Sequence, residues 1–339
     1  MRVAVFGTGY WAGFQAAAWQ AVGVEVAGAW NRSYDRAAAF CARFGIKKVF
    51  KTAEEAFIDN DFDVADIITD PAGHLDIARL CAKFKKPMIC QKPLANTAEE
   101  CAEIARLVKM SGIWAAVHEN FRYQPQYTAF QKILAESGLG GVLRADIQMR
   151  SPDRAILLKQ PALSVMPHMV LRDMGPHIFD TMRFLFGEAE TIAAVCGTVT
   201  RGLRVPDTAV SVLKLRRVPV VSCMLVNRPV YRVAAECENG TLVLDEMSRV
   251  VKTQNGKTEV VYDDPPERLS YIPDEDWKVH GAQVFHSIPA CLSALKSAFT
   301  ARKQAETSLA DNIESMRLVF AAIRSSDEKR EINREEITI

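Results

Sequence analysis

Residues 2–19 read RVAVFGTGYWAGFQAAAW and decide the fold of the first part of the chain. A short apolar run, typical of a buried parallel strand, is followed by a glycine turn and the start of a helix. The turn fits the pattern G-x-G-x-x-G/A at Gly7, Gly9 and Ala12. In that pattern the first glycine permits a sharp turn, the second lets the backbone approach a pyrophosphate, and the third small residue lets the helix lie close to the strand.

The N-terminus of the helix offers backbone N–H groups to an anion, so we expect Thr8, Tyr10 and Trp11 to line the same site. An ordinary strand-to-helix turn is the alternative. The position of the motif, directly between a strand and a helix at the start of the chain, favours a dinucleotide-binding turn.

Length and composition favour a protein of two domains with a small-molecule partner. The 339 residues exceed one ordinary core, and 49% of them are hydrophobic. The 42 lysines and arginines nearly balance the 41 aspartates and glutamates, so nucleic acid or an anionic membrane is not expected as a partner. We find no leader segment and no apolar run of membrane-spanning length, and we expect a cytoplasmic protein.

Eight cysteines are scattered through the chain without a C-x-x-C pair. This pattern indicates buried apolar thiols in a reducing compartment, and we expect no metal site.

The second predicted strand, residues 24–30, ends at the position that reads the adenosine ribose of a dinucleotide. An acidic residue there would repel a 2'-phosphate, whereas Asn31 does not, and Arg32, Ser33 and Arg36 could bind that phosphate. The position therefore favours NADP over NAD. The alternative is that Arg32 stacks on adenine and that either cofactor binds.

Strands continue to alternate with helices up to residue 120, which predicts a doubly wound parallel (Rossmann) sheet. The strand at residues 64–69 ends at Thr69 and Asp70, where open parallel sheets bind ligands. His74 opens the next helix. We expect it in the cofactor site, and the alternative is a helix-start residue that touches solvent.

A later strand ends in Gln91-Lys92-Pro93. Lysine is rarely interior without a partner, and here it would stand at the carboxyl edge of the sheet, within reach of the nicotinamide. A rigid peptide before Pro93, which can be cis, could fix its direction. The last strand of the first domain leads into His118-Glu119-Asn120, and Asn120 is a further candidate for binding cofactor and substrate.

From residue 121 the pattern changes to long strands, with hairpin turns at Asn239-Gly240 and Asn255-Gly256. We predict an α+β domain with a large, open, mostly antiparallel sheet over residues 121–325, for substrate binding and oligomerisation. Residues 1–120 form the dinucleotide-binding domain, and residues 326–339 form an exposed charged tail. One open sheet face indicates a homodimer or homotetramer.

Within the second domain, Asp173 and His177 are four residues apart around Pro176. If the helix begins before Asp173, a carboxylate and an imidazole lie on one helix face, and histidine most often transfers protons in enzymes. The alternative is that Asp173 only caps a helix that starts with Pro176.

Taken together, these motifs resemble the glucose-fructose oxidoreductase, inositol dehydrogenase and rhizopine catabolism family of NAD(P)-dependent oxidoreductases. The matching stretches are GTGYWA at residues 7–12, QKP at 91–93, HENFRYQP at 118–125 and D-x-x-x-H at 173–177. Two positions depart from the family pattern. Gln91 replaces the usual glutamate of an E-K-P motif, and Asn31 replaces an acidic residue.

The resemblance implies hydride transfer between a sugar or polyol carbon and nicotinamide C4, such as oxidation of an aldose to its lactone. Removing hydride from a carbinol also requires a base and a cation. We expect His177 as the base, Asp173 as the group that orients it, and Lys92 as electrostatic clamp and proton relay. Lys92 is the alternative base. Asn120, Arg150 and His168 are candidate hydroxyl ligands, with structural hydrogen bonding as the alternative.

Two other functions stay open. A related enzyme could use nicotinamide transiently for elimination or glycoside cleavage, and a regulator could sense the cofactor without catalysis. The presence of Lys92, Asp173 and His177 disfavours the regulator.

Overall fold

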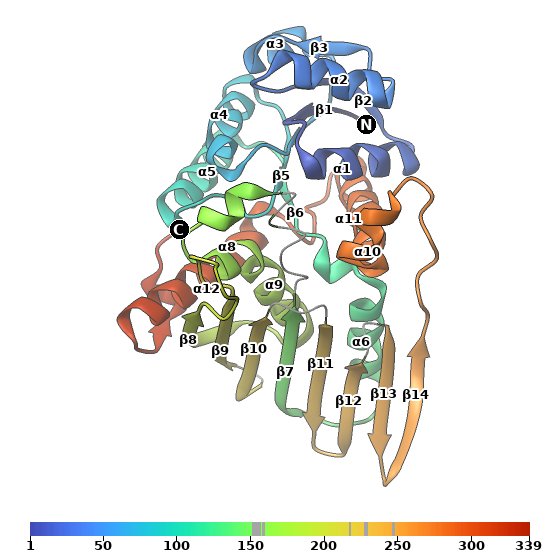
Figure 1. Ribbon diagram of the computed structural model, residues 1–339, viewed down its shortest axis with the longest axis vertical. Coiled ribbons are helices and arrows are strands. Elements are labelled where there is room, and N and C mark those ends of the chain that lie inside the picture. The colour runs from blue at the N-terminus through green and yellow to red at the C-terminus, as the bar shows by residue number, and fades with distance from the viewer. Residues whose placement is uncertain (151–156, 158–159, 217, 227–229, 246–247) are drawn as a thin grey trace. The chain divides into compact units, whose positions relative to one another are not determined.

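The computed structural model describes residues 1–150, 157, 160–216, 218–226, 230–245 and 248–339 (Figure 1). The chain divides into two compact units. The first unit holds Met1–Glu119, Ile288–Met316 and Thr338–Ile339, and the second holds Asn120–Ser287 and Arg317–Ile337. Residues 288–316, which we expected in the second domain, therefore belong to the first unit.

The first unit contains, among the described residues, a six-stranded parallel sheet in the order β3-β2-β1-β4-β5-β6 (Figure 1). This order confirms the doubly wound prediction, and it reverses direction between β1 and β4, where such sheets bind ligands. The strands are Arg2–Phe6 (β1), Glu25–Trp30 (β2), Lys48–Phe50 (β3), Val64–Ile67 (β4), Met88–Gln91 (β5) and Ala115–His118 (β6). The helices are Tyr10–Ala21 (α1), Tyr34–Phe44 (α2), Ala53–Asp59 (α3), His74–Phe84 (α4) and Ala98–Ser111 (α5).

Local sequence signals set the limits of these helices. Ser33 caps α2 at its start, and Gly45 ends it in the left-handed conformation at φ 66°. Thr52 and Glu55 form a reciprocal capping box at the start of α3. By contrast, the N-cap residue of α1 is Gly9, which has no side chain with which to cap the helix.

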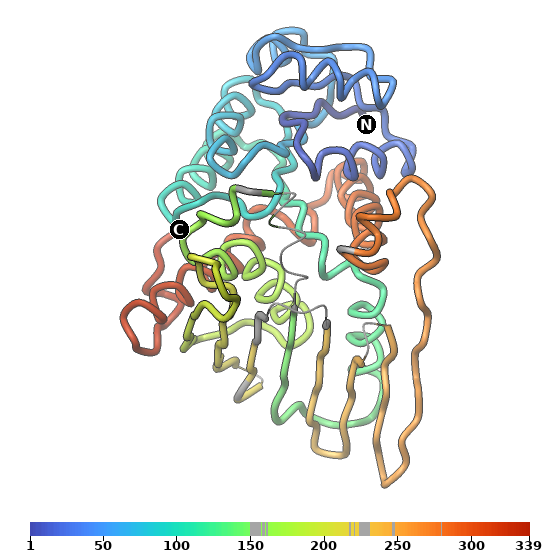
Figure 2. The backbone as a smooth tube through the Cα atoms, in the orientation of Figure 1, coloured from blue at the N-terminus to red at the C-terminus, as the bar shows by residue number. Residues whose placement is uncertain are grey.

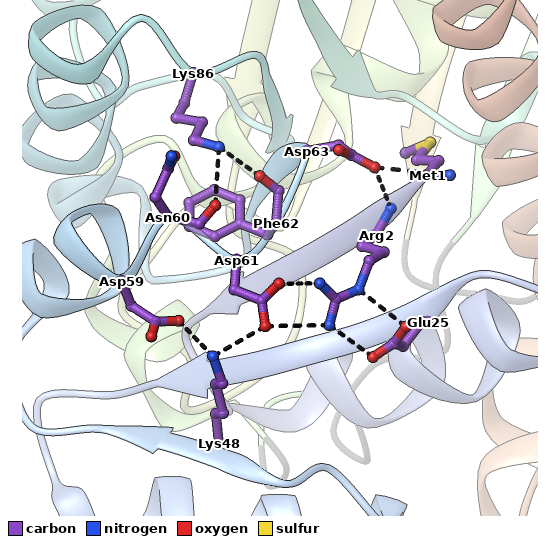
Figure 3. Close-up of polar contacts among 10 residues, drawn as sticks. All are labelled: Met1, Arg2, Glu25, Lys48, Asp59, Asn60, Asp61, Phe62, Asp63 and Lys86. Atoms are coloured by element: carbon purple, nitrogen blue, oxygen red, sulfur yellow. Dashed lines mark hydrogen bonds and ion pairs between the residues drawn. The ribbon is translucent and has the colours of Figure 1, made fainter.

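A charged network joins the beginnings of three strands at the edge of the sheet opposite the glycine turn (Figure 3). Arg2 Nε donates to Glu25 Oε2 at 2.9 Å and the Arg2 guanidinium also contacts Asp61. Lys48 Nζ binds Asp59 at 2.7 Å and Asp61 at 2.9 Å. These side chains are at least one third exposed, so each pair stabilises the unit only modestly.

Late residues complete the first unit, which explains why residues 288–316 belong to it. The backbone N–H of Val117 in β6 donates to Thr307 O at 2.8 Å, and Ala116 pairs with Ser308. Trp114 Nε1 donates to Lys303 O at 2.9 Å. The outer edge of β6 is thereby covered by chain from far along the sequence.

The second unit contains, in its described residues, a nine-stranded sheet in the order β14-β13-β12-β11-β7-β10-β9-β8-β15 (Figure 1). Only β10 and β7 pair in parallel among these neighbours, which confirms a mostly antiparallel sheet. The strands are Val142–Arg150 (β7), Ala189–Gly197 (β8), Thr208–Leu215 (β9), Val220–Val226 (β10), Val230–Cys237 (β11), Gly240–Asp245 (β12), Arg249–Gln254 (β13), Lys257–Asp263 (β14) and Ile332–Asn333 (β15).

Strands β11 and β12 form one hairpin and strands β13 and β14 form another, and Figure 2 shows both turns as tight reversals of the backbone. Asn255 and Gly256 have φ of 52° and 74°, as a two-residue turn of this type requires. The other turn is displaced by one residue from the prediction, because Cys237 pairs with Gly240 and the turn is Glu238-Asn239. Gly240 is needed in the strand itself, since a Cβ there would lie 2.1 Å from Thr253 O.

Helices cover one face of this sheet. Helix α6 packs on β12, β13 and β14, and α9 packs on β7 and β10. The helices of this unit, including the two that continue into the first unit, are Pro125–Glu136 (α6), Met169–Asp173 (α8), Gly175–Phe186 (α9), Asp274–His280 (α10), Ala282–Thr300 (α11) and Leu309–Glu328 (α12). Strand β9 alternates between buried and exposed residues, so its second face meets solvent in the single chain.

Residues 326–339 are mostly exposed, as expected, but they are folded. Helix α12 continues to Glu328, and β15 pairs with β8. Ile332 is fully buried, and Arg334 binds Glu188 at 2.9 Å. Ile332 is an apolar residue among charged ones, and the burial of its side chain stabilises the folded segment. In the described part of the chain, the helices are all too short or too polar to cross a membrane.

Candidate active site

The glycine turn after β1 is pressed against the end of β4. Gly7 has φ +105°, and a Cβ there would lie 2.5 Å from Ile68 O, so only glycine fits. A Cβ at Gly9 would meet nothing within 4 Å. The N-terminus of α1 thus faces open space, and its first turn carries no acidic residue. This geometry fits the pyrophosphate of a dinucleotide, because the helix N-terminus carries partial positive charge.

The residues expected at the adenosine ribose are arranged around Asn31. Its Nδ2 donates to Thr8 Oγ1 at 2.8 Å, and its Oδ1 accepts from the Ser33 N–H at 2.9 Å. Arg32 is 84% exposed and pairs with Asp70, also exposed, at 3.5 Å. Because an exposed pair of this kind is weak, Arg32 could exchange Asp70 for a ligand phosphate at small cost.

His74 is fully buried, so the alternative that it touches solvent is wrong. Its Nδ1 lies 3.1 Å from Leu94 O and its Nε2 lies 3.0 Å from Thr69 O. Burial lowers the pKa of His74, while these carbonyl contacts act in the opposite direction. The ring connects the loop after β4 to the loop after β5, and its expected role in cofactor binding stays a prediction.

Lys92 directly follows β5, and its backbone is held in place by the side chain of Gln91. The Lys92 N–H donates to Gln91 Oε1 at 2.8 Å, and the Lys92–Pro93 peptide is cis. Gln91 lies opposite His118 in the parallel pairing of β5 and β6, with its Nε2 3.2 Å from His118 Nδ1. The same Nε2 donates to Gln15 Oε1 of α1 at 3.0 Å.

Asp66 extends this series of hydrogen bonds into the core of the sheet. It was not among the expected site residues. It is fully buried in the middle of β4. Its Oδ1 accepts from Gln15 Nε2 and its Oδ2 accepts from Trp19 Nε1, both at 2.7 Å. We call the line from Asp66 through Gln15 and Gln91 to the Lys92 N–H the amide relay. A carboxylate inside the apolar run VADIIT was the sequence signal for it.

In the second unit, Asp173 and His177 occupy two nearly continuous helices. Asp173 ends α8, and Met174 caps α9 while keeping helical angles of φ −99° and ψ −22°. The alternative in which Asp173 caps α9 is therefore wrong. The Ile178 N–H donates to Met174 O at 3.1 Å, so helical bonding resumes at once and the four-residue spacing is retained.

Aromatic residues surround this carboxylate and imidazole. The His177 ring stacks on Phe121 with centroids 3.7 Å apart, and Tyr231 lies edge-on to Phe121 at 6.0 Å. Burial, and to a lesser degree the charge of Asp173, raises the pKa of Tyr231. Stacking on Phe121 therefore restricts the orientation of the buried imidazole, and Tyr231 lies near enough to Asp173 to feel its charge.

A buried ion pair supports the same region and was not anticipated. Arg122 binds both carboxylate oxygens of Asp180, with Nε 2.7 Å from Oδ2. Asp180 is fully buried in α9, so the pair ties the segment after Asn120 to the helix that carries His177. The sequence signal was the residue pattern D-x-x-x-H-x-x-D, in which a second aspartate follows His177 on the helix.

The three candidate hydroxyl ligands differ in their surroundings. Asn120 Nδ2 donates to Ser287 Oγ at 2.6 Å. His168 has a left-handed backbone at φ 51°, and its Nε2 lies 3.4 Å from Asp327 Oδ2 of α12. These contacts give Asn120 and His168 structural partners. Arg150 ends β7, and its side chain lies outside the described part of the structure.

Two family models match the chain along consecutive parts of its length. Residues 1–119 match the model described as "Oxidoreductase family, NAD-binding Rossmann fold". Residues 127–243 match the model described as "GFO/IDH/MocA C-terminal domain".

Similar proteins cover nearly the whole chain. D-apiose dehydrogenase from Rhizobium rhizogenes is 27% identical over 98% of this chain and 97% of its own length. D-apiose dehydrogenase from Paraburkholderia graminis is 26% identical over 97% of this chain and 88% of its own length. An oxidoreductase from Agrobacterium radiobacter, solved in complex with NAD+, L-tartaric acid and magnesium, is 25% identical, with a TM-score of 0.93 and 99% of each chain covered.

Proposed function

The chain belongs to the GFO/IDH/MocA family of oxidoreductases, and from this premise we propose that it is an NAD(P)-dependent dehydrogenase acting on the CH–OH group of a sugar or polyol. The observation that carries the proposal is the group of elements at the carboxyl edge of the parallel sheet. The glycine turn follows β1, the Thr69-Asp70 loop follows β4, and Lys92 follows β5. Ligands of open parallel sheets bind at this edge.

Gly7, Gly9 and Ala12, with the N-terminus of α1, would hold the pyrophosphate, and Asn31, Arg32 and Ser33 would face the adenosine ribose. The bound dinucleotide supplies the hydride acceptor at nicotinamide C4. The Agrobacterium oxidoreductase was solved with NAD+, which supports a nicotinamide cofactor. We retain the preference for NADP over NAD. On binding a 2'-phosphate, Arg32 would lose only its exposed ion pair with Asp70.

The proton that leaves the substrate hydroxyl requires a base. We assign this role to His177, whose ring is held by stacking on Phe121, with Asp173 stabilising the imidazolium. We assign to Lys92 the role of a cation beside the developing oxyanion. The reverse assignment, with Lys92 as the base, is separable by the variants described in the Discussion.

We propose an aldose as substrate, oxidised to its lactone, with D-apiose as the first candidate because two D-apiose dehydrogenases match nearly the whole chain. The test is a screen of D-apiose, other free pentoses, hexoses and inositols with NAD+ and with NADP+, followed by the absorbance of the reduced cofactor. Net reduced cofactor with one sugar is the expected result. Product without net reduced cofactor would indicate transient use of nicotinamide for elimination or glycoside cleavage, and cofactor binding without any product would indicate a sensing regulator.

We further propose a homodimer or homotetramer formed through the uncovered face of the nine-stranded sheet. Val195 and Val212 on this face are 72% and 48% exposed in the single chain, and contiguous exposed apolar patches mark interaction surfaces. Light scattering of the protein and of a Val212→Arg variant tests this, and a monomer at all concentrations would contradict it. We also propose a cytoplasmic location, because the eight cysteines are free thiols.

A further inference from the structure

The hydrogen bonds of the amide relay in the first unit all run in one direction, because the groups at its two ends determine which atoms donate and which accept. An ionised carboxylate only accepts hydrogen bonds, so Gln15 must turn its NH2 group toward Asp66. A backbone N–H only donates, so Gln91 must turn its oxygen toward Lys92. The two amides then meet with the Gln91 NH2 against the Gln15 oxygen, at 3.0 Å. Reversal of one amide alone would bring two donors or two acceptors face to face.

We propose that Asp66 is a positioning residue that, through Gln15 and Gln91, fixes the backbone from which the Lys92 side chain extends. The importance of this for turnover rests on the proposed function, in which Lys92 acts on the substrate. Asp66 itself does no chemistry, because it is fully buried and both of its oxygens accept from protein donors. In a buried network of this kind, an unsatisfied member is costly, so the direction is firmly set.

The relay explains why position 91 carries an amide. A glutamate there would place a carboxylate oxygen against Gln15 Oε1, and Gln15 would have to reverse and lose its bond to Asp66. Reversal of the whole relay is nevertheless possible. With Asp66→Asn and Gln91→Glu together, the new amide at position 66 donates to the Gln15 oxygen. The Gln15 NH2 and the Lys92 N–H then both donate to the new carboxylate at position 91.

Two titratable neighbours bear on the design of the experiment. His118 Nδ1 accepts from Gln91 in the present relay, and a change of tautomer lets the ring donate to a carboxylate instead. Cys90, on the adjacent strand β5, has its thiol pKa raised by burial, by neighbouring thiols and by the charge of Asp66. Burial raises the pKa of Asp66 to about 7, so the comparison is made at about pH 9, where its carboxylate is ionised.

The experiment is a double-mutant cycle of Asp66→Asn, Gln91→Glu and the two combined. For each protein we would measure kcat with the best sugar from the screen and the Kd of the dinucleotide alone. We expect each single substitution to lower kcat by about 10-fold or more while Kd changes by less than about 3-fold. The combined variant should recover to within about 3-fold of the original kcat, because all of its buried donors again have acceptors.

The matched control is Trp19→Phe. It removes a bond of the same length to the same carboxylate, from a donor outside the relay. We expect it to lower stability but to change kcat by less than about 3-fold. If Trp19→Phe lowers kcat as much as Asp66→Asn, the effect is one of core stability and the positioning role is wrong.

A readout that needs no turnover separates this proposal from the proposed function. Hydrogen exchange of the Lys92 amide is followed by NMR in the cofactor-free protein with isotope-labelled lysine, and its signal is identified by its loss in Lys92→Arg. Asp66→Asn should exchange this amide about 10-fold faster or more, and the combined variant should regain protection. Unchanged protection in Asp66→Asn, or no recovery in the combined variant, would overturn the relay. Absence of turnover with every sugar would overturn only the proposed function.

Discussion

The His177 imidazole lies flat against the Phe121 ring, with the ring centroids 3.7 Å apart and the planes inclined by 9°. Phe121 follows the last strand of the parallel sheet in sequence, and His177 lies in the first turn of α9. Stacking of this kind restricts the rotation of the imidazole without using either ring nitrogen.

Phe121→Leu should reduce kcat by about 10-fold, because the imidazole loses the surface that aligns it. The Kd of the dinucleotide should stay within about 2-fold, since Phe121 is not among the residues that we assign to the cofactor. Steady-state kinetics and fluorescence titration check this. An unchanged kcat would show that the stack serves only the packing of the second unit.

Lys92→Ala should reduce turnover by at least about 10²-fold while the dinucleotide still binds, because the cation beside the developing oxyanion is lost. Lys47→Ala, a substitution of an exposed lysine in the same unit, serves as the control. Near-normal turnover of the Lys92 variant would remove Lys92 from the chemistry. Loss of the acidic limb from the pH profile of kcat, the limb on which a general base is protonated and inactive, would assign Lys92 the role of base instead of His177.

Gly7→Ala should lower stability, whereas Gly9→Ala should weaken cofactor binding, although both glycines belong to the same motif. A Cβ at Gly7 collides with the backbone at Ile68, so unfolding should become easier by on the order of 3 kcal/mol. A Cβ at Gly9 meets only open space, so stability should be retained. It would nevertheless occupy the place of the pyrophosphate and weaken the Kd of the dinucleotide by about 10-fold or more. Calorimetry and titration together check this pair, and tight binding by Gly9→Ala would contradict the assigned pyrophosphate site.

Arg32→Ala should weaken binding of NADP by about 10-fold and that of NAD by less than about 2-fold, because only NADP offers a 2'-phosphate to the guanidinium. Asp70→Asn should have the reverse effect on NADP, since it frees Arg32 from its partner. Titrations of both cofactors measure this. If NAD binds the original protein as tightly as NADP does, the preference for NADP is wrong.

Asp66 should make stability depend on pH. Burial raises its pKa from 3.8 to about 7 in the folded protein, so the folded state holds a proton that the unfolded state has already lost. The free energy of unfolding therefore decreases as the pH rises through this window and levels off above about pH 7. Relative to Asp66→Asn, the original protein should lose about 3 kcal/mol between about pH 5 and about pH 8. Denaturant unfolding measures the difference, and a constant difference across this range would contradict it.

Local sequence patterns predicted the fold well where residues close together in the sequence determine it. The alternation of strands and helices gave the parallel sheet, and Asn255-Gly256 gave a hairpin turn, because these signals act over a few residues. The placement of residues 288–316 was not predictable in this way. Their partners at Ala116 and Val117 lie almost two hundred residues earlier, and no local pattern encodes that pairing.

For the candidate site, the sequence identified the residue types but not their partners. Lys92 and His177 were visible from their positions at the ends of elements, whereas Gln15 lies in an alanine-rich helix that gives no sign of the relay. His74 illustrates the same limit. Its position at the start of a helix left contact with solvent as the alternative, but the ring is buried and the carbonyl oxygens of two loops lie beside its two nitrogens.

The pairing of Thr307 and Ser308 with β6 has a consequence for synthesis on the ribosome. Strand β6 is made almost two hundred residues before Thr307, so its outer edge stays open until Thr307 and Ser308 have been translated. An open strand edge invites association with other nascent chains. We therefore infer that the first unit matures only after Ser308 has left the ribosome, and that a product shortened before Thr307 would aggregate.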